Sequence, residues 1–353
     1  MMGNREKKTY VVTSNPIVRQ KRKTRDIMLD VLIALIPTMA FGIYNFGTSA
    51  LVVVLVAMGS SAFFEWAYRK LNHKSCTVGD CSALVTGAIM AMSLPPSSPW
   101  WMVVIGTFFA IVFVKQLYGG LGKNFLNPAL AGRAFLTASY AGHMTSWVIP
   151  RTLLHTGSFP ADATTMATPL AYLYSGEAMP EYYGKFDMML GHLPGSIGEV
   201  CTIAILIGGV YLLLRKVITW QIPVSFIGTV AVLCLIFGHE GYSRIDWMEY
   251  NIVAGGLIFG AFFMANDYSS SPVVPKGQII YGIGCGVITV LIRYFGAYPE
   301  GVTYAILVMN LCTWAIDKLT LRHQFGVSKE DVKAMKLAKK EAKKAAKKEG
   351  GAA

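Results

Sequence analysis

Long apolar runs separated by short polar segments are the feature that most limits how this chain can fold. Of its 353 residues, 54% are hydrophobic and only 15% are charged. A transmembrane helix needs roughly 17–25 largely apolar residues. Suitable segments lie near 27–46, 50–69, 80–96, 100–118, 124–141, 197–215, 221–238, 250–267, 277–295 and 301–317. The pattern predicts an all-α membrane protein with about ten transmembrane helices.

Lys and Arg are shared unequally between alternate connections. The leader carries "RQKRKTR" (19–25), and basic residues such as Arg69, Lys115, Lys123 and Arg215 follow every second span. The opposite connections, above all 142–196, are poorer in these residues. The positive-inside rule therefore places both termini in the cytoplasm and 142–196 outside. The formal net charge of +12 then indicates contact with the lipid bilayer and its anionic headgroups rather than binding of nucleic acid.

The chain shows signs of an internal duplication. "GAIMAMSLPPSSP" (87–99) and "GAFFMANDYSSSP" (260–272) have the same length, the same first two residues and the same Ser-Ser-Pro ending. Chance similarity of apolar sequence is the alternative. Because the two segments face opposite sides in the predicted topology, they indicate two inverted five-helix repeats. The expected division is a basic leader (1–26), a first repeat (27–141), an outer loop (142–196), a second repeat (197–318) and a cytoplasmic Lys-rich tail (319–353).

Polar residues near the "SLPPSSP" and "NDYSSSP" breaks are candidates for a site. Interrupted helices expose backbone groups that only a cavity or a ligand can satisfy in a membrane. Ionisable groups there are costly, so Asp267 and Asp80 are candidates for an ion pathway. Asn124 and Asn127 are candidates for binding. Interfacial positions for Asp80 and Asn124, and a helix cap at Asn127 before Pro128, are the alternatives.

Motifs for other chemistry do not stand out. The "YGGLGKN" segment lacks the spacing of a phosphate-binding P-loop, and no GxSxG or HExxH pattern is present. The six cysteines are scattered, mostly within apolar runs, and the six histidines do not cluster. We therefore expect no metal site, no catalytic residue and no complete active site in this chain alone.

The hydroxyl-rich stretch "DATTMATPL" (162–170) lies in the predicted outer loop. Thr168 precedes Pro169, so Thr168 is expected to cap a short helix that begins at the proline. A phosphate on this hydroxyl would lie near unpaired backbone N–H groups. An ordinary capping threonine is the alternative.

Several of these segments together resemble one protein family. They are "DATTMATPLA", "GKNFLNPALAGRAF", "LPGSIGE", "FFMANDYSSSP" and "GAYPEGVTYAILVMN", and the resemblance covers 14–320. The family contains the D subunit of the Rnf complex, an ion-translocating ferredoxin:NAD oxidoreductase. It also contains the paralogous B subunit of the sodium-pumping NADH:quinone reductase. The resemblance implies a fold like that of the urea and ammonium transporters.

The resemblance also implies a covalent flavin. In this family flavin mononucleotide (FMN) is joined through its phosphate to the last threonine of a signature, which matches Thr168 here, with Asp162, Thr165 and Ala167 as the other signature positions. A flavin transferase would attach it. The other membrane and peripheral Rnf subunits would be partners, and electron transfer between ferredoxin and NAD modules would drive Na⁺ or H⁺ translocation.

A second, non-covalent flavin is implied by "NFLNPA". The resemblance assigns riboflavin to this segment, and hence to Asn124 and Asn127. Asn266 and Tyr268 depart from the common family residues beside Asp267. From the residues alone, a channel for a small neutral solute and a structural scaffold remain as alternatives, because fold does not fix function.

Overall fold

The computed structural model describes residues 22–151, 165–175, 180, 184–191, 193–239, 241–296 and 300–320. These residues form helices joined by short connections, together with one isolated antiparallel bridge between Val148 and Thr165. The predicted all-α class is confirmed for this part of the chain. The basic leader as far as residue 21, the Lys-rich tail from residue 321 and Asp162 lie outside the described residues.

The first half of the molecule comprises the helices up to residue 144. They are α1 (Thr24–Phe46), α2 (Thr48–Leu71), the 3₁₀ turn η1 (Val78–Asp80), α3 (Ser82–Met92), α4 (Trp100–Phe108), the π-helix η2 (Phe109–Gln116), α5 (Pro128–Ser139) and α6 (Ala141–Met144). Within this half, α2 packs against both α3 and α4. The π-helix η2 follows α4 without a break, so the two form one continuous apolar helical segment.

The second half follows two short helices of the central loop, α8 (Pro169–Ser175) and α9 (Lys185–Leu190). Its helices are α10 (Thr202–Leu214), α11 (Gln221–Phe237), α12 (Arg244–Val253), α13 (Leu257–Phe259) with the π-helix η3 (Gly260–Met264), α14 (Pro275–Phe295) and α15 (Val302–Thr320). Here α11 packs against α12 and α14, as α2 packs against α3 and α4 in the first half.

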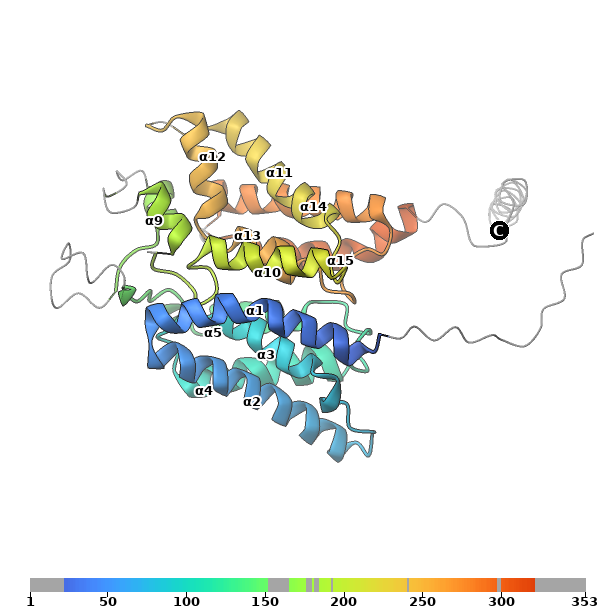
Figure 1. Ribbon diagram of the computed structural model, residues 1–353. Coiled ribbons are helices and arrows are strands. Elements are labelled where there is room, and N and C mark those ends of the chain that lie inside the picture. Colours follow the sequence, from blue (N-terminus) through green and yellow to red (C-terminus); the bar gives the residue numbers. More distant parts are fainter. Residues whose placement is uncertain are drawn as a thin grey trace, which may run out of the picture.

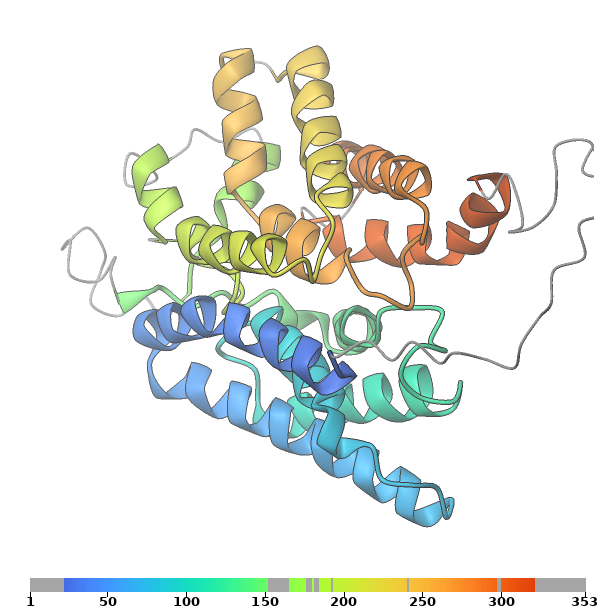
Figure 2. The same cartoon turned by 45° about the vertical axis from the view of Figure 1, so that its right-hand side comes forward.

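The two halves lie one on the other, with α1–α5 forming one layer and α10–α15 the other (Figures 1 and 2). The first helices of the two halves, α1 and α10, pack together across the interface, and so do α5 and α15, which correspond to the fifth predicted span of each half. Corresponding helices therefore meet at the interface, which is the contact pattern expected of two related halves.

The helices differ in whether they are long enough to cross a membrane. Among the described residues, four helices (α1, α2, α14 and α15) are long and apolar enough to cross a membrane, and a fifth span arises if the bent pair α12 and α13–η3 counts as one. The other predicted spans correspond to shorter apolar helices or to α5. The structure is thus that of a multi-pass helical membrane protein, while the full number of ten spans stays a prediction.

Helix ends and bends follow Pro, Ser and Gly. The predicted breaks are confirmed as helix ends: α3 ends at Met92, before "SLPPSSP", and η3 ends at Met264, before "NDYSSSP". The span predicted near 250–267 corresponds to α12 together with α13 and η3, and the chain bends by 60° between α12 and α13, which was not predicted. At the bend Gly255 has a φ of +77°, and a Cβ on Gly256 would lie only 2.3 Å from Glu199 Oε1. Glycine is therefore favoured at Gly255 by its backbone conformation, and a side chain at Gly256 would require the Glu199 carboxylate to move.

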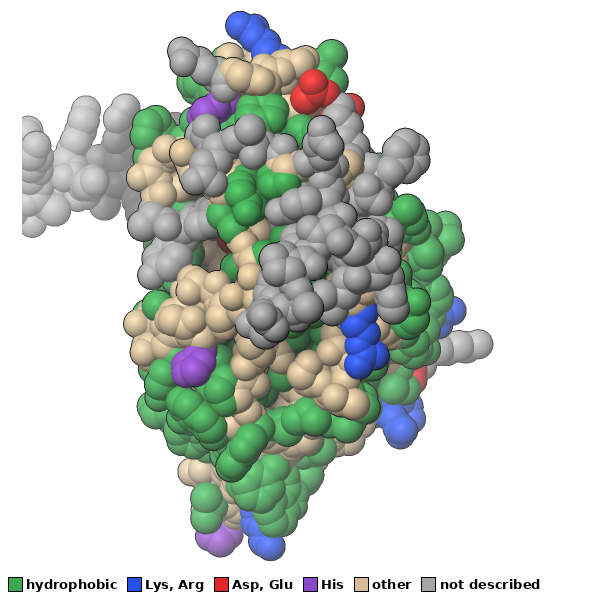
Figure 3. Space-filling model, turned by 90° about the vertical axis from the view of Figure 1, so that its left-hand side faces the viewer, with side chains coloured by type: hydrophobic (Ala, Val, Ile, Leu, Met, Phe, Trp, Pro, Cys, Tyr) green, Lys and Arg blue, Asp and Glu red, His purple; other side chains and the backbone are tan. Residues whose placement is uncertain are grey.

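The two ends of the molecule differ. The start of α1 and the end of α15 lie at one end, whereas α9 lies at the opposite end (Figure 1). Viewed from the α9 end, hydrophobic side chains form the flanks of the molecule (Figure 3). The central loop and the described chain ends are thus on opposite sides, as the predicted topology requires.

Candidate functional site

Among the described residues, two pockets between the helices contain predicted site residues, and we name each by the polar group that it carries. The amide cavity has about 710 Å³ of empty space, part of it open to solvent, and is bordered by Asn124, Asn127 and Asp267. The threonine pocket has about 580 Å³, also partly open, and is bordered by Thr168 and Arg133. The fold therefore brings Asn124, Asn127 and Asp267 together at the amide cavity, although they are far apart in the sequence. Thr168 lies at the other pocket.

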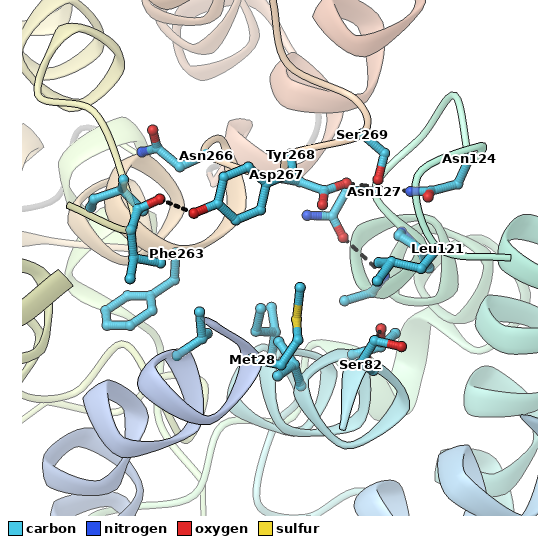
Figure 4. Close-up of a pocket in the computed structure, with 18 of the residues that line it drawn as sticks. Met28, Ser82, Leu121, Asn124, Asn127, Phe263, Asn266, Asp267, Tyr268 and Ser269 are labelled. Carbon is cyan, nitrogen blue, oxygen red and sulfur yellow. Dashed lines mark hydrogen bonds between the residues drawn. The ribbon is translucent and has the colours of Figure 1, made fainter. Parts of the chain in front are cut away.

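One wall of the amide cavity consists of amide and carboxylate groups (Figure 4). Asn127 caps α5, since its Oδ1 accepts hydrogen bonds from the N–H groups of Ala129 (3.0 Å) and Leu130 (3.4 Å). Its Nδ2 donates to the carbonyl of Met264 at 2.9 Å. Asn124 Nδ2 donates to Asp267 Oδ2 at 3.3 Å. The capping alternative for Asn127 is therefore confirmed, and the same residue also faces the cavity.

Unpartnered polar atoms line the same cavity. Asn124 Oδ1 and Ser269 Oγ are buried and have no hydrogen-bond partner among the described residues. A buried polar atom without a partner costs free energy of about 1–3 kcal/mol. Such atoms at the edge of an open cavity are what a hydrogen-bonding ligand would satisfy.

The opposite wall carries a buried amine. Lys115 Nζ donates to Glu65 Oε2 at 2.8 Å and to Ser82 Oγ at 2.6 Å. The side chains of Lys115 and Glu65 are 2% and 1% exposed. The prediction that Lys115 is one of the loop charges that set the topology was wrong, because its partner Glu65 holds it inside the protein.

Asp80 lies apart from both pockets. Its Oδ1 accepts a hydrogen bond from the N–H of Ser82 at 2.8 Å, at the start of α3. Asp80 is half-buried and does not line the amide cavity. The geometry gives this carboxylate the role of a helix cap.

Thr168 is placed as the sequence predicts, at the start of α8. Its Oγ1 accepts a hydrogen bond from the N–H of Ala171 at 3.3 Å, and Pro169 begins the helix. The preceding residues run beside another strand-like segment, because Thr165 bridges Val148 and the N–H of Met166 donates to Trp147 O at 3.0 Å. Thr165 and Ala167 are exposed and Thr168 is half-buried.

A buried ionic cluster supports the threonine pocket. Arg133 on α5 pairs with Glu199 at 3.5 Å and with Glu300, and it donates to Thr303 Oγ1 at 3.0 Å. The Arg133 and Glu199 side chains are 6% and 5% exposed. Glu300 and Thr168 also border a smaller hollow together with Glu199, on the other side of the threonine. Arg133 thus ties α5 to the segments that precede α10 and α15.

Glu199 lies in the connection before α10. Its buried carboxylate is 3.5 Å from Arg133 and also borders the hollow beside Thr168. The hollow therefore contains an acidic group that is paired with Arg133.

Helix α5 joins the two pockets. Ala129 lines the amide cavity and Arg133 lines the threonine pocket. These residues are four positions apart, which is about 6 Å along an α-helix. Groups bound in the two pockets would be separated at this point by about one turn of α5.

Four ionisable residues in or beside these pockets were not predicted as site residues from the sequence: Glu65, Lys115, Glu199 and Glu300. Glu65 and Lys115 each stand within apolar runs, "AFFEWAY" and "IVFVKQL". Ionisable residues in such runs are functional candidates by default, so this signal was present. Glu199 and Glu300 lie in connections, and nothing local to them indicates that they share one arginine.

Comparisons with known proteins agree with these motifs. The family model described as "NQR2, RnfD, RnfE family" matches residues 11–326. The D subunit of the Na(+)-translocating ferredoxin:NAD(+) oxidoreductase complex from Acetobacterium woodii is 47% identical over 90% of this chain and 96% of its own length. The proton-translocating counterpart from Clostridium ljungdahlii is 42% identical over 91% and 97%. The D subunit of the ion-translocating oxidoreductase complex of Escherichia coli is 34% identical over 90% and 98%.

Proposed function

The chain belongs to the NQR2, RnfD, RnfE family, and from this membership we propose that it is the D-type membrane subunit of an Rnf ion-translocating ferredoxin:NAD oxidoreductase. The observation that carries the proposal is the likeness to named D subunits along about nine-tenths of the chain. Such a subunit belongs to an oxidoreductase without holding a complete active site. Its partners are the other membrane and peripheral subunits, which exchange electrons with ferredoxin and NAD.

The transported ion is a cation. Two of the relatives are named for different ions, Na⁺ for one and protons for the other, so their names favour neither for this chain. The paralogous quinone-reductase subunit is the alternative within the family. The likeness to subunits named for ferredoxin:NAD oxidoreductases favours the Rnf assignment.

The proposed topology has ten membrane-crossing segments in two inverted repeats, in a fold like that of the urea and ammonium transporters. Three observations support it: the paired packing of α1 with α10 and of α5 with α15, the matching helix contacts inside each half, and the helix ends at the two Ser-Ser-Pro motifs. Both termini lie in the cytoplasm of the bacterial inner membrane. The central loop, at the opposite end of the molecule from the described chain ends (Figure 1), then faces outward.

Thr168 carries covalent FMN in this proposal. The residues present fit the group, because a half-buried hydroxyl borders an open pocket that also contains Trp147, Tyr304 and Arg133. Trp147 and Tyr304 offer aromatic faces, and Arg133 places a cation in the pocket wall. Thr165, Ala167 and the predicted signature residue Asp162 form the segment that a flavin transferase reads.

The amide cavity holds riboflavin in this proposal. Asn124 and Asn127 present amide groups, and the unpartnered Asn124 Oδ1 and Ser269 Oγ are free for a ligand. Apolar side chains such as Phe263 complete the lining. A flavin combines an apolar ring with polar edges, so this mixture of groups fits it.

The protein's own residues position the flavins and control charge around them, while the bound flavins supply the redox chemistry. Asn124 and Asn127 fix one cofactor, and Thr168 fixes the other. Helix α5 brings the two pockets to within about one turn of each other, which supports electron transfer between them. Asp267 in the cavity wall is the candidate for coupling this transfer to the ion path.

The test of this function is a flavin assay on the whole chain. We expect the protein, co-expressed with a flavin transferase, to give a fluorescent band after denaturing electrophoresis and a modified peptide containing Thr168. Acid extraction should release a second, non-covalent flavin. Wild-type protein without a fluorescent band would instead favour the solute-channel or scaffold alternatives.

A further inference from the structure

Lys115 is held against the amide cavity by an unusual local structure. It lies in the last turn of the π-helix η2, and π-helical turns occur often at functional sites. Its amine is buried between Glu65 and Ser82, and both Lys115 and Ser82 border the cavity. A buried cation in the wall of a cofactor site influences that cofactor through a medium of low dielectric constant.

The counterion of Lys115 lies behind it rather than in the cavity. Glu65 is not among the residues that line the amide cavity, and its Oε1 accepts a hydrogen bond from Thr77 Oγ1 at 2.6 Å. The ion pair is therefore oriented, with its positive end at the cavity wall. Such a pair exerts a positive potential on whatever occupies the cavity.

The carboxylate of Asp267 lies across the cavity from Lys115 and has different partners. Asp267 belongs to the opposite wall (Figure 4), where its Oδ2 accepts hydrogen bonds from Ser270 Oγ at 2.9 Å and from Asn124. Those donors stabilise the carboxylate, which itself lines the cavity. The two walls thus present an amine on one side and a hydrogen-bonded carboxylate on the other.

From this geometry we infer that Lys115 raises the reduction potential of the flavin held in the amide cavity. Reduction adds negative charge to the flavin ring, and a nearby cation stabilises the reduced form more than the oxidised form. Lys115 acts through its field and is a tuning residue rather than a catalytic one. The inference rests on the proposed riboflavin site.

The experiment is a redox titration of the purified membrane protein with both flavins bound. Lys115→Gln keeps a hydrogen-bond donor but removes the charge, so the potential of the non-covalent flavin should become more negative. Lys115→Arg should restore it towards the wild-type value. The exposed Lys123 lies eight positions along the chain, and Lys123→Gln is the matched control that should leave the potential unchanged. The covalent flavin is an internal control, since its potential should not move in any variant.

Three results would overturn the inference. Lys115→Gln protein that retains the flavin at an unchanged potential would reduce the ion pair to a structural role. Loss of the oxidised flavin from Lys115→Gln, but not from Lys123→Gln, would assign the amine to binding instead. Wild-type protein without any non-covalent flavin would overturn the proposed site and this inference together, which distinguishes that failure from the first two.

Discussion

The amide cavity and the threonine pocket differ in whether their buried polar groups have hydrogen-bond partners within the protein. In the amide cavity, Asn124 Oδ1 and Ser269 Oγ are buried without partners. In the threonine pocket, Arg133 is bonded to Glu199, Glu300 and Thr303. Among the described residues that line it, none has a buried side-chain polar atom left unpartnered.

The difference matches two ways of holding a cofactor. A non-covalent ligand gains from groups that lack a partner until it arrives, because these groups gain hydrogen bonds on binding. A covalent ligand needs an accessible nucleophilic hydroxyl in a fixed frame. The amide cavity has the first property and the threonine pocket the second, so substitutions in the two pockets should have different consequences.

The largest expected effect is at Thr168. Thr168→Val should abolish flavin fluorescence of the denatured chain, because no hydroxyl remains for the phosphoester, while the extractable flavin of the amide cavity stays. Thr168→Ser keeps the hydroxyl and should retain part of the signal. Thr164→Ala is the matched control from the same segment and should keep it fully, because Thr164 is not one of the signature positions. Fluorescence that persists in Thr168→Val would place the attachment elsewhere.

Arg133 is expected to stabilise the segments that form the threonine pocket. Arg133→Met leaves Glu199 buried without its partner, and breaking a buried ion pair in this way costs about 3–5 kcal/mol of stability. The measurement is the thermal unfolding midpoint in detergent. Arg133→Lys keeps the charge and should lose less. A midpoint of Arg133→Met equal to that of the wild type would show that the cluster does not fix the pocket.

The amide cavity and the threonine pocket also show which site residues the sequence could predict and which it could not. Thr168 was located because a Thr-Pro step is a local signal for a helix start, and Asn127 before Pro128 gave the same signal for α5. Arg133 pairs with residues 66 and 167 positions away, and Lys115 pairs with one 50 positions away. Such contacts depend on how the layers stack, and no local pattern encodes them.

The bend before α13 illustrates the same limit within one segment. The run around Gly255 and Gly256 is apolar enough to be predicted as one span, and the glycines do not by themselves reveal a 60° bend. The close approach of Glu199 to Gly256 is a tertiary contact. The bend was therefore missed, whereas the helix ends at Pro- and Ser-rich motifs were found.

Asp267 tests whether the amide cavity serves the ion as well as the cofactor. Asp267→Asn removes the negative charge but keeps an oxygen that can accept from Ser270. Cation transport driven by electron transfer in the assembled complex should fall severalfold, while the extractable flavin and the covalent flavin stay. Unchanged transport per electron transferred would leave Asp267 with a structural role only.

Two substitutions of Asn127 can separate its role in ligand binding from its role as the cap of α5. Asn127→Leu removes the bond to Met264 and the cap of α5, so extractable flavin should decrease severalfold without loss of the covalent one. Asn127→Asp keeps the capping oxygen and loses the donor. If flavin content falls in the leucine variant but not in the aspartate variant, capping accounts for the effect. An equal fall in both identifies the amide donor as the binding group.

The smallest effect is expected at Asp80, because it borders neither pocket. Its carboxylate accepts the N–H of Ser82, the first residue of α3, and loss of one such hydrogen bond costs about 1 kcal/mol. Asp80→Ala should therefore lower the thermal midpoint slightly. Asp80→Asn should not, since the asparagine side chain keeps an oxygen that can accept the same hydrogen bond. Neither variant should alter flavin content or the cations moved per electron. A transport defect in Asp80→Asn comparable to that of Asp267→Asn would contradict the capping role and place Asp80 on the ion path, extending the functional region from the amide cavity to the start of α3.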